Sequence, residues 1–323
     1  MVGDDGEVVR LMITCRPLKI FWGIAQTYNF ETMPESVEAL ECCKVDLDNM
    51  LADHRLLGFD ILLSCCDTAG GCINITLRHV ESLVAAVVTA DVVIYTSGHG
   101  CQSQEGKTYL LVRDDRFSAD WKSKHNNFCI QETATAIAAK ADNTTILVFI
   151  VDACREIMQA GSKRSKRGPV SDPAFKLKIS KLFQQHVIWQ ATSAGLLSMV
   201  EPGIQGMSRF TGCLHNALTA VAAGKSEMIK ASGSDHFVSG MVALKDMVHR
   251  EVRERVIRHF QPGTDDAEAQ APEYQEGKVQ EAFAFKLILF PPFPADLGVL
   301  PLHVCSHGTD PRWKTLWEKG KIV

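Results

Sequence analysis

The chain lacks the features that mark membrane, secreted and nucleic-acid-binding proteins. No apolar run reaches the roughly 18 residues of a membrane-spanning helix. The segment that begins Met1-Val2-Gly3 has neither a basic region nor an apolar one, so we expect no secretory signal. The net charge is −4 at pH 7, which gives no basic excess for binding nucleic acid. We therefore expect a cytoplasmic protein that binds neither membranes nor nucleic acids.

Metal-site and disulfide patterns are also missing. The 11 cysteines are odd in number and lie largely inside apolar segments, which is typical of reduced thiols rather than of a disulfide framework. The cysteines Cys42-Cys43, Cys65-Cys66 and Cys72 do not have the spacing of zinc ligands, and no calcium-binding loop of the EF-hand type occurs. We expect no metal site and no cofactor.

What the chain does contain is an alternation of strand-like and helix-like segments. Short runs of apolar, β-branched residues predict buried strands, and segments with apolar residues at helical spacing predict helices between them. We predict strands at 18–25, 59–63, 92–98, 146–153, 187–191 and 282–290, and helices at 34–57, 75–88, 130–141, 210–223 and 241–260.

This β-α-β order predicts an α/β fold, a three-layer sandwich in which a mostly parallel sheet of about six strands has helices on both faces. The domain is expected to span residues 18–290, between an amino-terminal segment, 1–17, and a proline-containing tail, 291–323. Two polar stretches, the basic 161–172 and the acidic 261–280, predict mobile loops.

Two of the predicted strands end next to a residue that can do chemistry. His99 follows the run 92–98, and Cys154 follows the run 146–153. The carboxyl ends of parallel strands meet at one edge of the sheet, where ligands bind in open α/β folds. Because a thiol nucleophile requires a nearby base, we predict that Cys154 and His99 form a catalytic dyad. The alternative is that both side chains are simply packed in the core.

The motifs around this pair resemble those of caspase-type cysteine peptidases of clan CD. The segment 97–100, Ser-Gly-His-Gly, matches the histidine motif of that family, and the segment 152–155, Asp-Ala-Cys-Arg, is similar to its cysteine motif. Paracaspases and metacaspases carry an Asp two residues before the cysteine and are the more similar types, and the segment 127–131, Asn-Phe-Cys-Ile-Gln, is also similar to paracaspases. The resemblance implies a caspase-like fold, with a large-subunit-like part to about residue 160 and a small-subunit-like part over 173–290.

The resemblance also implies roles for individual residues. Cys154 is the expected nucleophile and His99 the expected general base and acid, while the backbone N–H groups of Gly100 and Cys154 are expected to form the oxyanion hole. A glycine after the histidine lets the backbone approach the substrate, because it has no Cβ. The function implied is that of a cysteine endopeptidase acting on proteins or peptides.

Two acidic residues carry the expected substrate preference. Caspases cleave after Asp, whereas paracaspases and metacaspases cleave after Arg or Lys through an acidic pocket. Asp152 stands two residues before the cysteine, and Asp46, thirteen residues before Phe59, stands where paracaspases have a second carboxylate. Two carboxylates hold a guanidinium and repel an acidic side chain, so we predict cleavage after Arg, with Lys left open. The alternative for Asp46 is a solvated carboxylate on a helix face.

Three further features allow two interpretations each. Paracaspases have another acidic residue where 194–197 reads Ala-Gly-Leu-Leu here, and the nearby Glu201 is out of register, so the preference for Arg over Lys stays open. The basic loop 163–167 is either cleaved by the enzyme itself or a solvated run of charge. The strand 282–290 either pairs across a homodimer or is covered by the tail that follows it.

The function itself has one alternative. In this alternative, the chain has a caspase-like fold but little or no peptidase activity, and it serves as an interaction scaffold. Metacaspases often require calcium, but no feature of this sequence indicates such a requirement.

Overall fold

The computed structural model describes most of the predicted domain. The described residues are 18–29, 38–87, 89–103, 107–113, 127–141, 145–154, 156–157, 186–192, 198, 206–222, 244–245, 247–255 and 272–276. The segments 1–17, 161–172, 282–290 and 291–323 lie outside them, so the domain boundaries, the basic loop and the last strand stay predictions.

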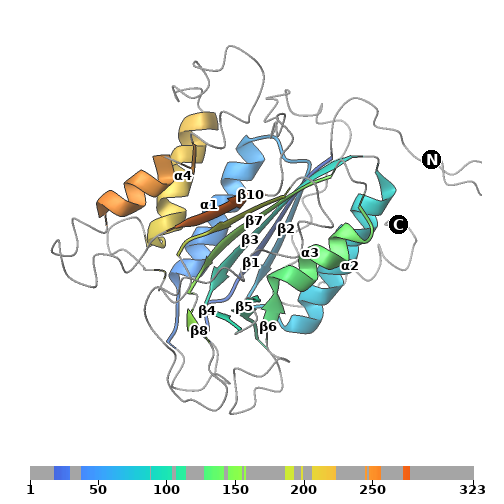
Figure 1. Cartoon of the computed structure of the whole chain (residues 1–323), viewed down its shortest axis with the longest axis horizontal. Helices are drawn as coiled ribbons and strands as arrows, with labels where there is room; N and C mark the ends of the chain where they lie inside the picture. Colours follow the sequence, from blue (N-terminus) through green and yellow to red (C-terminus); the bar gives the residue numbers. More distant parts are fainter. Residues whose placement is uncertain are drawn as a thin grey trace, which may run out of the picture.

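A six-stranded sheet runs through the middle of the domain (Figure 1). Its strand order is β10-β9-β7-β3-β1-β2, and only β10 is antiparallel to its neighbour. The strands are Leu18–Ala25 (β1), Ile61–Cys66 (β2), Ala90–Gly98 (β3), Ile146–Ala153 (β7), His186–Gln190 (β9) and Glu273–Glu276 (β10). The predicted α/β fold with a mostly parallel, six-stranded sheet is confirmed.

Helices cover both faces of this sheet (Figure 1). α1 and α4, together with the helical residues 247–255, pack on one face, and α2 and α3 pack on the other. A parallel sheet requires this arrangement, because both of its faces are apolar. The helices are Cys42–Leu56 (α1), Gly70–Ala86 (α2), Ile130–Ala138 (α3) and Arg209–Ala222 (α4).

Some element boundaries differ from the predicted ones. α2 begins at Gly70 rather than at Ile75, although Gly70 and Gly71 are poor helix formers. The burial of Ile73 in the core explains this start, because tertiary packing outweighs local propensity. β2 is also displaced toward the carboxyl end, since its pairing with β1 continues to Cys66.

The prediction of an irregular acidic stretch at 261–280 is wrong for Glu273–Glu276. These four residues form β10, which pairs with β9 at one edge of the sheet. An edge strand is held by backbone hydrogen bonds on one side only, so it does not need the apolar run that identifies the inner strands.

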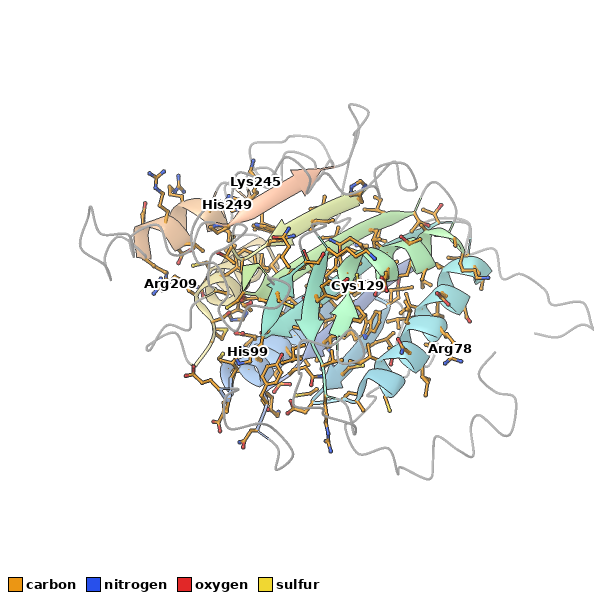
Figure 2. The ribbon with its side chains drawn as sticks, turned by 60° about the horizontal axis from the view of Figure 1, so that its bottom comes forward. Arg78, His99, Cys129, Arg209, Lys245 and His249 are labelled. Carbon is orange, nitrogen blue, oxygen red and sulfur yellow. The ribbon has the colours of Figure 1, made fainter. Side chains whose placement is uncertain are left out.

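A second, four-stranded sheet with the order β6-β5-β4-β8 adjoins the carboxyl ends of β3 and β7 (Figure 2). Its strands are too short to be recognised in the sequence. β4 begins directly after His99, β8 begins two residues after Cys154, and Cys101 pairs with Glu156. The chain segments that leave β3 and β7 therefore continue side by side. The four strands are Gly100–Gln102 (β4), Thr108–Leu111 (β5), Asn127–Cys129 (β6) and Glu156–Ile157 (β8).

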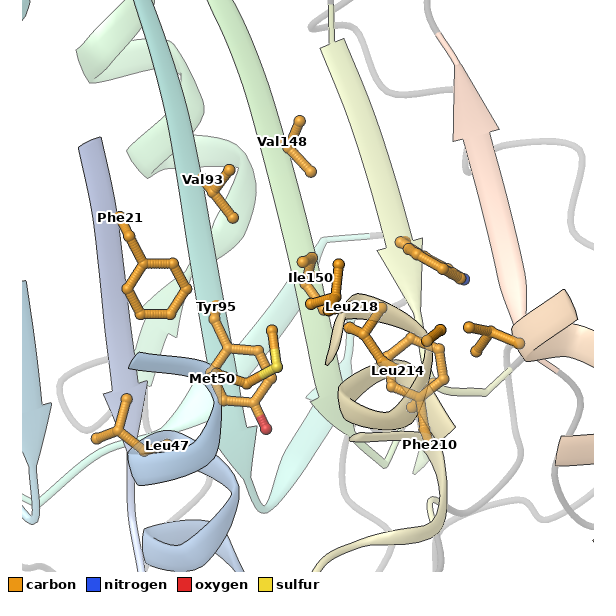
Figure 3. Packing of buried hydrophobic residues seen from close by; sticks show 14 of the residues in the cluster. Phe21, Leu47, Met50, Val93, Tyr95, Val148, Ile150, Phe210, Leu214 and Leu218 are labelled. Atoms are coloured by element: carbon orange, nitrogen blue, oxygen red, sulfur yellow. The ribbon is translucent and has the colours of Figure 1, made fainter. Parts of the chain in front are cut away.

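The two inner strands β3 and β7 are buried along their whole length. Their side chains alternate between two apolar layers: Tyr95 belongs to the layer under α1 and α4, and Ile94 belongs to the layer under α2 and α3. Figure 3 shows Met50 of α1 beside Tyr95, and Phe210 of α4 in the same layer. The helix α1 is therefore seated directly over the strand that leads to His99.

We expect Gly23→Ala to destabilise the domain by about 1–3 kcal/mol. Gly23 lies in β1 beneath α1, and a Cβ at this position would overlap Cδ1 of Leu47 and lie 3.1 Å from Cε1 of Phe21. Denaturant unfolding measures the effect. Gly71→Ala in α2 is the matched control, because a Cβ there meets nothing within 4 Å. Equal stabilities for the two variants would contradict the close contact between β1 and α1.

Candidate active site

The register of β3 and β7 places the two predicted catalytic residues at one edge of the sheet. Gly98 is paired with Ala153, and the preceding residues Ser97 and Asp152 are paired in the same way. His99 and Cys154 each follow the last pair, so they occupy corresponding positions on neighbouring parallel strands. This is the edge at which open α/β sheets bind ligands.

Backbone and tyrosine contacts fix the position and the tautomer of His99. Its backbone N–H donates to the hydroxyl of Tyr28 at 2.8 Å, and that hydroxyl donates to the carbonyl of Leu111 at 2.7 Å. Nε2 of His99 lies 2.7 Å from the carbonyl oxygen of Glu38. Because a carbonyl only accepts, Nε2 carries the proton, and Nδ1 is the basic nitrogen of the neutral ring.

The thiol of Cys154 is half-buried, and its Sγ lies 3.8 Å from the carbonyl oxygen of Ser198. The backbone on either side of the predicted site is closely packed. A Cβ on Gly100 would lie 2.5 Å from the carbonyl oxygen of Cys154 and 2.6 Å from Cβ of Ala153. Only glycine fits there, so the segment after the histidine touches the segment that carries the cysteine.

Asp46 and Asp152, the two acidic residues predicted to bind substrate, converge on Ser208. Asp46 comes from α1 and Asp152 from the end of β7, and both are buried. The backbone N–H of Ser208 donates to Oδ1 of Asp46 at 2.9 Å, and the hydroxyl of Ser208 donates to Oδ2 of Asp152. Asp46 is therefore not a solvated carboxylate on a helix face.

Hydroxyl groups complete the surroundings of the two carboxylates. Ser97 Oγ donates to Oδ2 of Asp46 at 3.2 Å. Ser198 Oγ donates to Oδ1 of Asp152 at 2.5 Å, and Thr211 Oγ1 donates to Oδ2 at 2.6 Å. Within the described residues, no salt bridge joins either carboxylate to a basic side chain.

The surroundings of Asp46 shift its pKa. Burial, and after it the negative charge of Asp152, raise the pKa of Asp46 to about 8. Hydrogen bonds from Ser208 and Ser97 lower the pKa of Asp46, but they do not offset the burial. A buried acid with an unusually high pKa, next to a second acid, is typical of functional sites.

Sequence reasoning did not assign roles to the hydroxyl groups around this pair. Ser97 belongs to the histidine motif, so the motif itself could have pointed to it. Ser208 and Thr211 lie at the start of α4, far along the chain from Asp46, and only the packing of α4 brings them there. The residues 194–197 and Glu201, which bear on a third acidic group, lie outside the described part of the chain.

No cluster of three or more His, Cys, Asp or Glu side chains in the described part of the chain could hold a metal ion. Among the helices that the structure describes, none has the length and hydrophobicity of a membrane span.

Comparisons with known proteins agree with this architecture. The family model described as Peptidase_C14, caspase domain, matches residues 24–283. The chain belongs to the caspase domain family. The structure of caspase-1 from Spodoptera frugiperda aligns with a TM-score of 0.50 over 81% of this chain and 89% of that chain, at 13% sequence identity. No curated protein sequence matches the chain.

The family match confirms the resemblance to caspase-like peptidases of clan CD that the two motifs indicated. The likeness to the insect caspase-1 supports the caspase-like fold, including the mostly parallel sheet between two helical layers. In this caspase domain, His99, Cys154 and the two buried acids lie at the carboxyl edge of β3 and β7.

We expect Asp46→Asn to stabilise the caspase domain at neutral and alkaline pH. Since the pKa of Asp46 is about 8 in the folded chain and about 4 in the unfolded chain, folding loses stability as the pH rises between these values. Asparagine does not ionise, so the variant should gain about 1–3 kcal/mol at pH 8 and little at pH 4.

Thermal unfolding of the wild type and the variant across this pH range measures the difference. Asp48→Asn is the control, since Asp48 is exposed on the same helix, where it pairs with Lys44. A stability difference at Asp46 that does not change with pH would contradict a buried, protonated carboxyl group.

Proposed function

We propose that this caspase domain is a cysteine endopeptidase that hydrolyses peptide bonds after basic P1 residues, Arg first, with Lys left open. The observation that carries the proposal is the pair of buried carboxylates, Asp46 and Asp152, bridged by Ser208. Asp152 lies near the end of β7 and Cys154 directly follows that strand, so the acidic site and the thiol belong to one edge of the sheet.

In the proposed reaction, the thiol of Cys154 gives its proton to Nδ1 of His99, and the thiolate attacks the scissile carbonyl carbon. The backbone N–H groups of Gly100 and Cys154 stabilise the negative charge on the carbonyl oxygen. His99 then protonates the leaving amine, which gives a thioester. A water molecule, deprotonated by His99, hydrolyses the thioester and restores the thiol.

Charge explains the preference for a basic P1 side chain. A guanidinium placed between two carboxylates forms paired, charge-assisted hydrogen bonds in surroundings of low dielectric constant. An acidic P1 side chain would meet two acids and no basic partner in the described part of the pocket, so it should be rejected. This preference is the one that paracaspases and metacaspases have, and it sets the proposed enzyme apart from caspases that cleave after Asp.

A peptide panel tests the proposal. Matched fluorogenic peptides with Arg, Lys or Asp at P1 are incubated with the full chain, with and without calcium. Cleavage of the Arg peptide should exceed that of the Asp peptide by at least about 100-fold in kcat/KM, since a charge reversal in a desolvated pocket costs several kcal/mol. Equal rates with and without calcium would support an enzyme that needs no cofactor.

Two variants show whether the activity belongs to the proposed dyad. Cys154→Ala should abolish cleavage, while Cys72→Ala, which removes an exposed cysteine, should leave it unchanged. Cleavage after Asp alone would refute the acidic pocket but leave the peptidase intact. Absence of cleavage under all conditions, including forced dimerisation, would refute the peptidase and favour the interaction scaffold.

Self-cleavage of the basic loop 163–167, which lies outside the described residues, follows from the same specificity. The wild type, purified and kept under active conditions, should separate into two fragments, and Cys154→Ala should remain intact. Mass spectrometry of both proteins measures the products. A wild-type chain that cleaves the Arg peptide but stays whole would show that the loop is only a solvated run of charge.

A further inference from the structure

The two carboxylates of the proposed P1 pocket are not equivalent in their hydrogen bonds. Asp152 accepts from the hydroxyls of Ser198, Ser208 and Thr211, and also from the backbone N–H of Thr211 at 3.3 Å. Among the described residues, Asp46 accepts from the N–H of Ser208 and the hydroxyl of Ser97, and the Ser208 side chain, shared with Asp152, also lowers its pKa. Donors stabilise the ionised form of a carboxylate, so Asp152 is the better site for the negative charge.

The direction of the hydroxyl protons supports this assignment. Thr211 Oγ1 has one proton, which it gives to Asp152, so the hydroxyl of Tyr95 donates to Thr211 at 2.8 Å. The chain of donors from Tyr95 through Thr211 therefore ends on Asp152.

The other groups that face Asp46 do not neutralise it. On α1, the hydrogen bond with Cys42, and after it burial, raise the pKa of the Cys43 thiol well above its usual value. On β3, burial raises the pKa of Tyr95 in the same way. Both groups are neutral at pH 7. Arg209, which follows Ser208 at the start of α4, is buried but forms no salt bridge with either carboxylate among the described residues.

We propose that Asp46 holds a proton in the free protein and releases it when a cationic P1 side chain enters the pocket, so that the binding of Arg is coupled to the release of one proton. This proposal rests on the proposed function. In the free state, one carboxylate charge is shared with the hydroxyl groups around Asp152. In the bound state, two carboxylates face one guanidinium, and the proton of Asp46 has passed to solvent.

The coupling predicts how affinity depends on pH. The pKa of Asp46 is about 8 in the free protein, and a neighbouring positive charge lowers it, because it favours the ionised form. At pH 7, Asp46 is protonated in most free molecules and must lose its proton before Arg binds. Above the pKa of Asp46, most free molecules are already ionised and no proton is lost. The affinity for an Arg peptide should therefore rise about tenfold for each pH unit below pH 8, and level off above it.

Isothermal titration calorimetry of the full-length Cys154→Ala protein measures the proton directly. A peptide with Arg at P1 is titrated at pH 7 in phosphate and in Tris, two buffers with different enthalpies of ionisation. The difference in heat should correspond to about one proton released per peptide bound. A peptide with citrulline, which has the shape of Arg without its charge, should bind more weakly and release about none.

The variant Asp46→Asn, added to Cys154→Ala, identifies the group that releases the proton. It should bind the Arg peptide without proton release, whereas Asp48→Asn in the same background should behave like the parent. Because His99 is present in both proteins, the comparison of Asp46→Asn with its parent isolates the proton that belongs to Asp46.

The outcomes separate this proposal from the proposed function. If the wild type cleaves after Arg but binding releases no proton, or Asp46→Asn leaves the release unchanged, the coupling is refuted and the peptidase stands. If the wild type neither cleaves nor binds the Arg peptide, both are refuted. Where binding is too weak for calorimetry, the wild-type KM should fall about tenfold between pH 6 and pH 7 for Arg and remain level for citrulline; equal profiles would refute the coupling.

Discussion

The pairing of β3 with β7 is the constraint on which the rest of the site depends. Both strands are buried on both faces, so a slip of one residue would move every side chain of a strand into the opposite layer. The whole core therefore fixes the register, which sets Ser97 opposite Asp152 and Gly98 opposite Ala153. His99 and Cys154 gain their common position from apolar packing that takes no part in the chemistry.

Burying Asp46 next to Asp152 lowers the stability of the folded chain. An apolar residue at Asp46 would avoid both the loss of hydration and the nearby negative charge of Asp152. The large apolar layer around Phe21, Tyr95 and Met50 offsets this cost. Its packing holds α1 against the sheet whatever the charge on the two acids. Under the proposed function, the folding stability that the free protein loses at Asp46 is recovered when a cationic side chain binds, and such a trade between stability and function is common.

The parts of the structure that could be predicted are those with a local signature. Buried parallel strands leave continuous apolar runs, so β3 and β7 could be recognised, and the short motifs at their ends identified His99, Cys154 and Asp152. The strands of the small sheet and β10 leave no such run, because two to four residues paired through their backbone need no apolar pattern. Ser208 could not be found either, since it is 162 positions from Asp46 in the sequence and no local pattern marks it.

A second buried acid on α1, Asp53, lies beside a basic side chain. Asp53 lies seven residues after Asp46, two helical turns along the same face, and contacts α4 seven residues after Ser208, where His215 Nδ1 is 2.8 Å from its Oδ2. The matching spacing means that α1 and α4 run in the same direction, joined at two levels. Burial raises the pKa of Asp53, but His215 opposes the shift, so this level is satisfied within the protein. The level at Asp46 has hydroxyls and a second acid but no basic partner in the described structure, and in the proposed function the cationic P1 side chain supplies the positive charge.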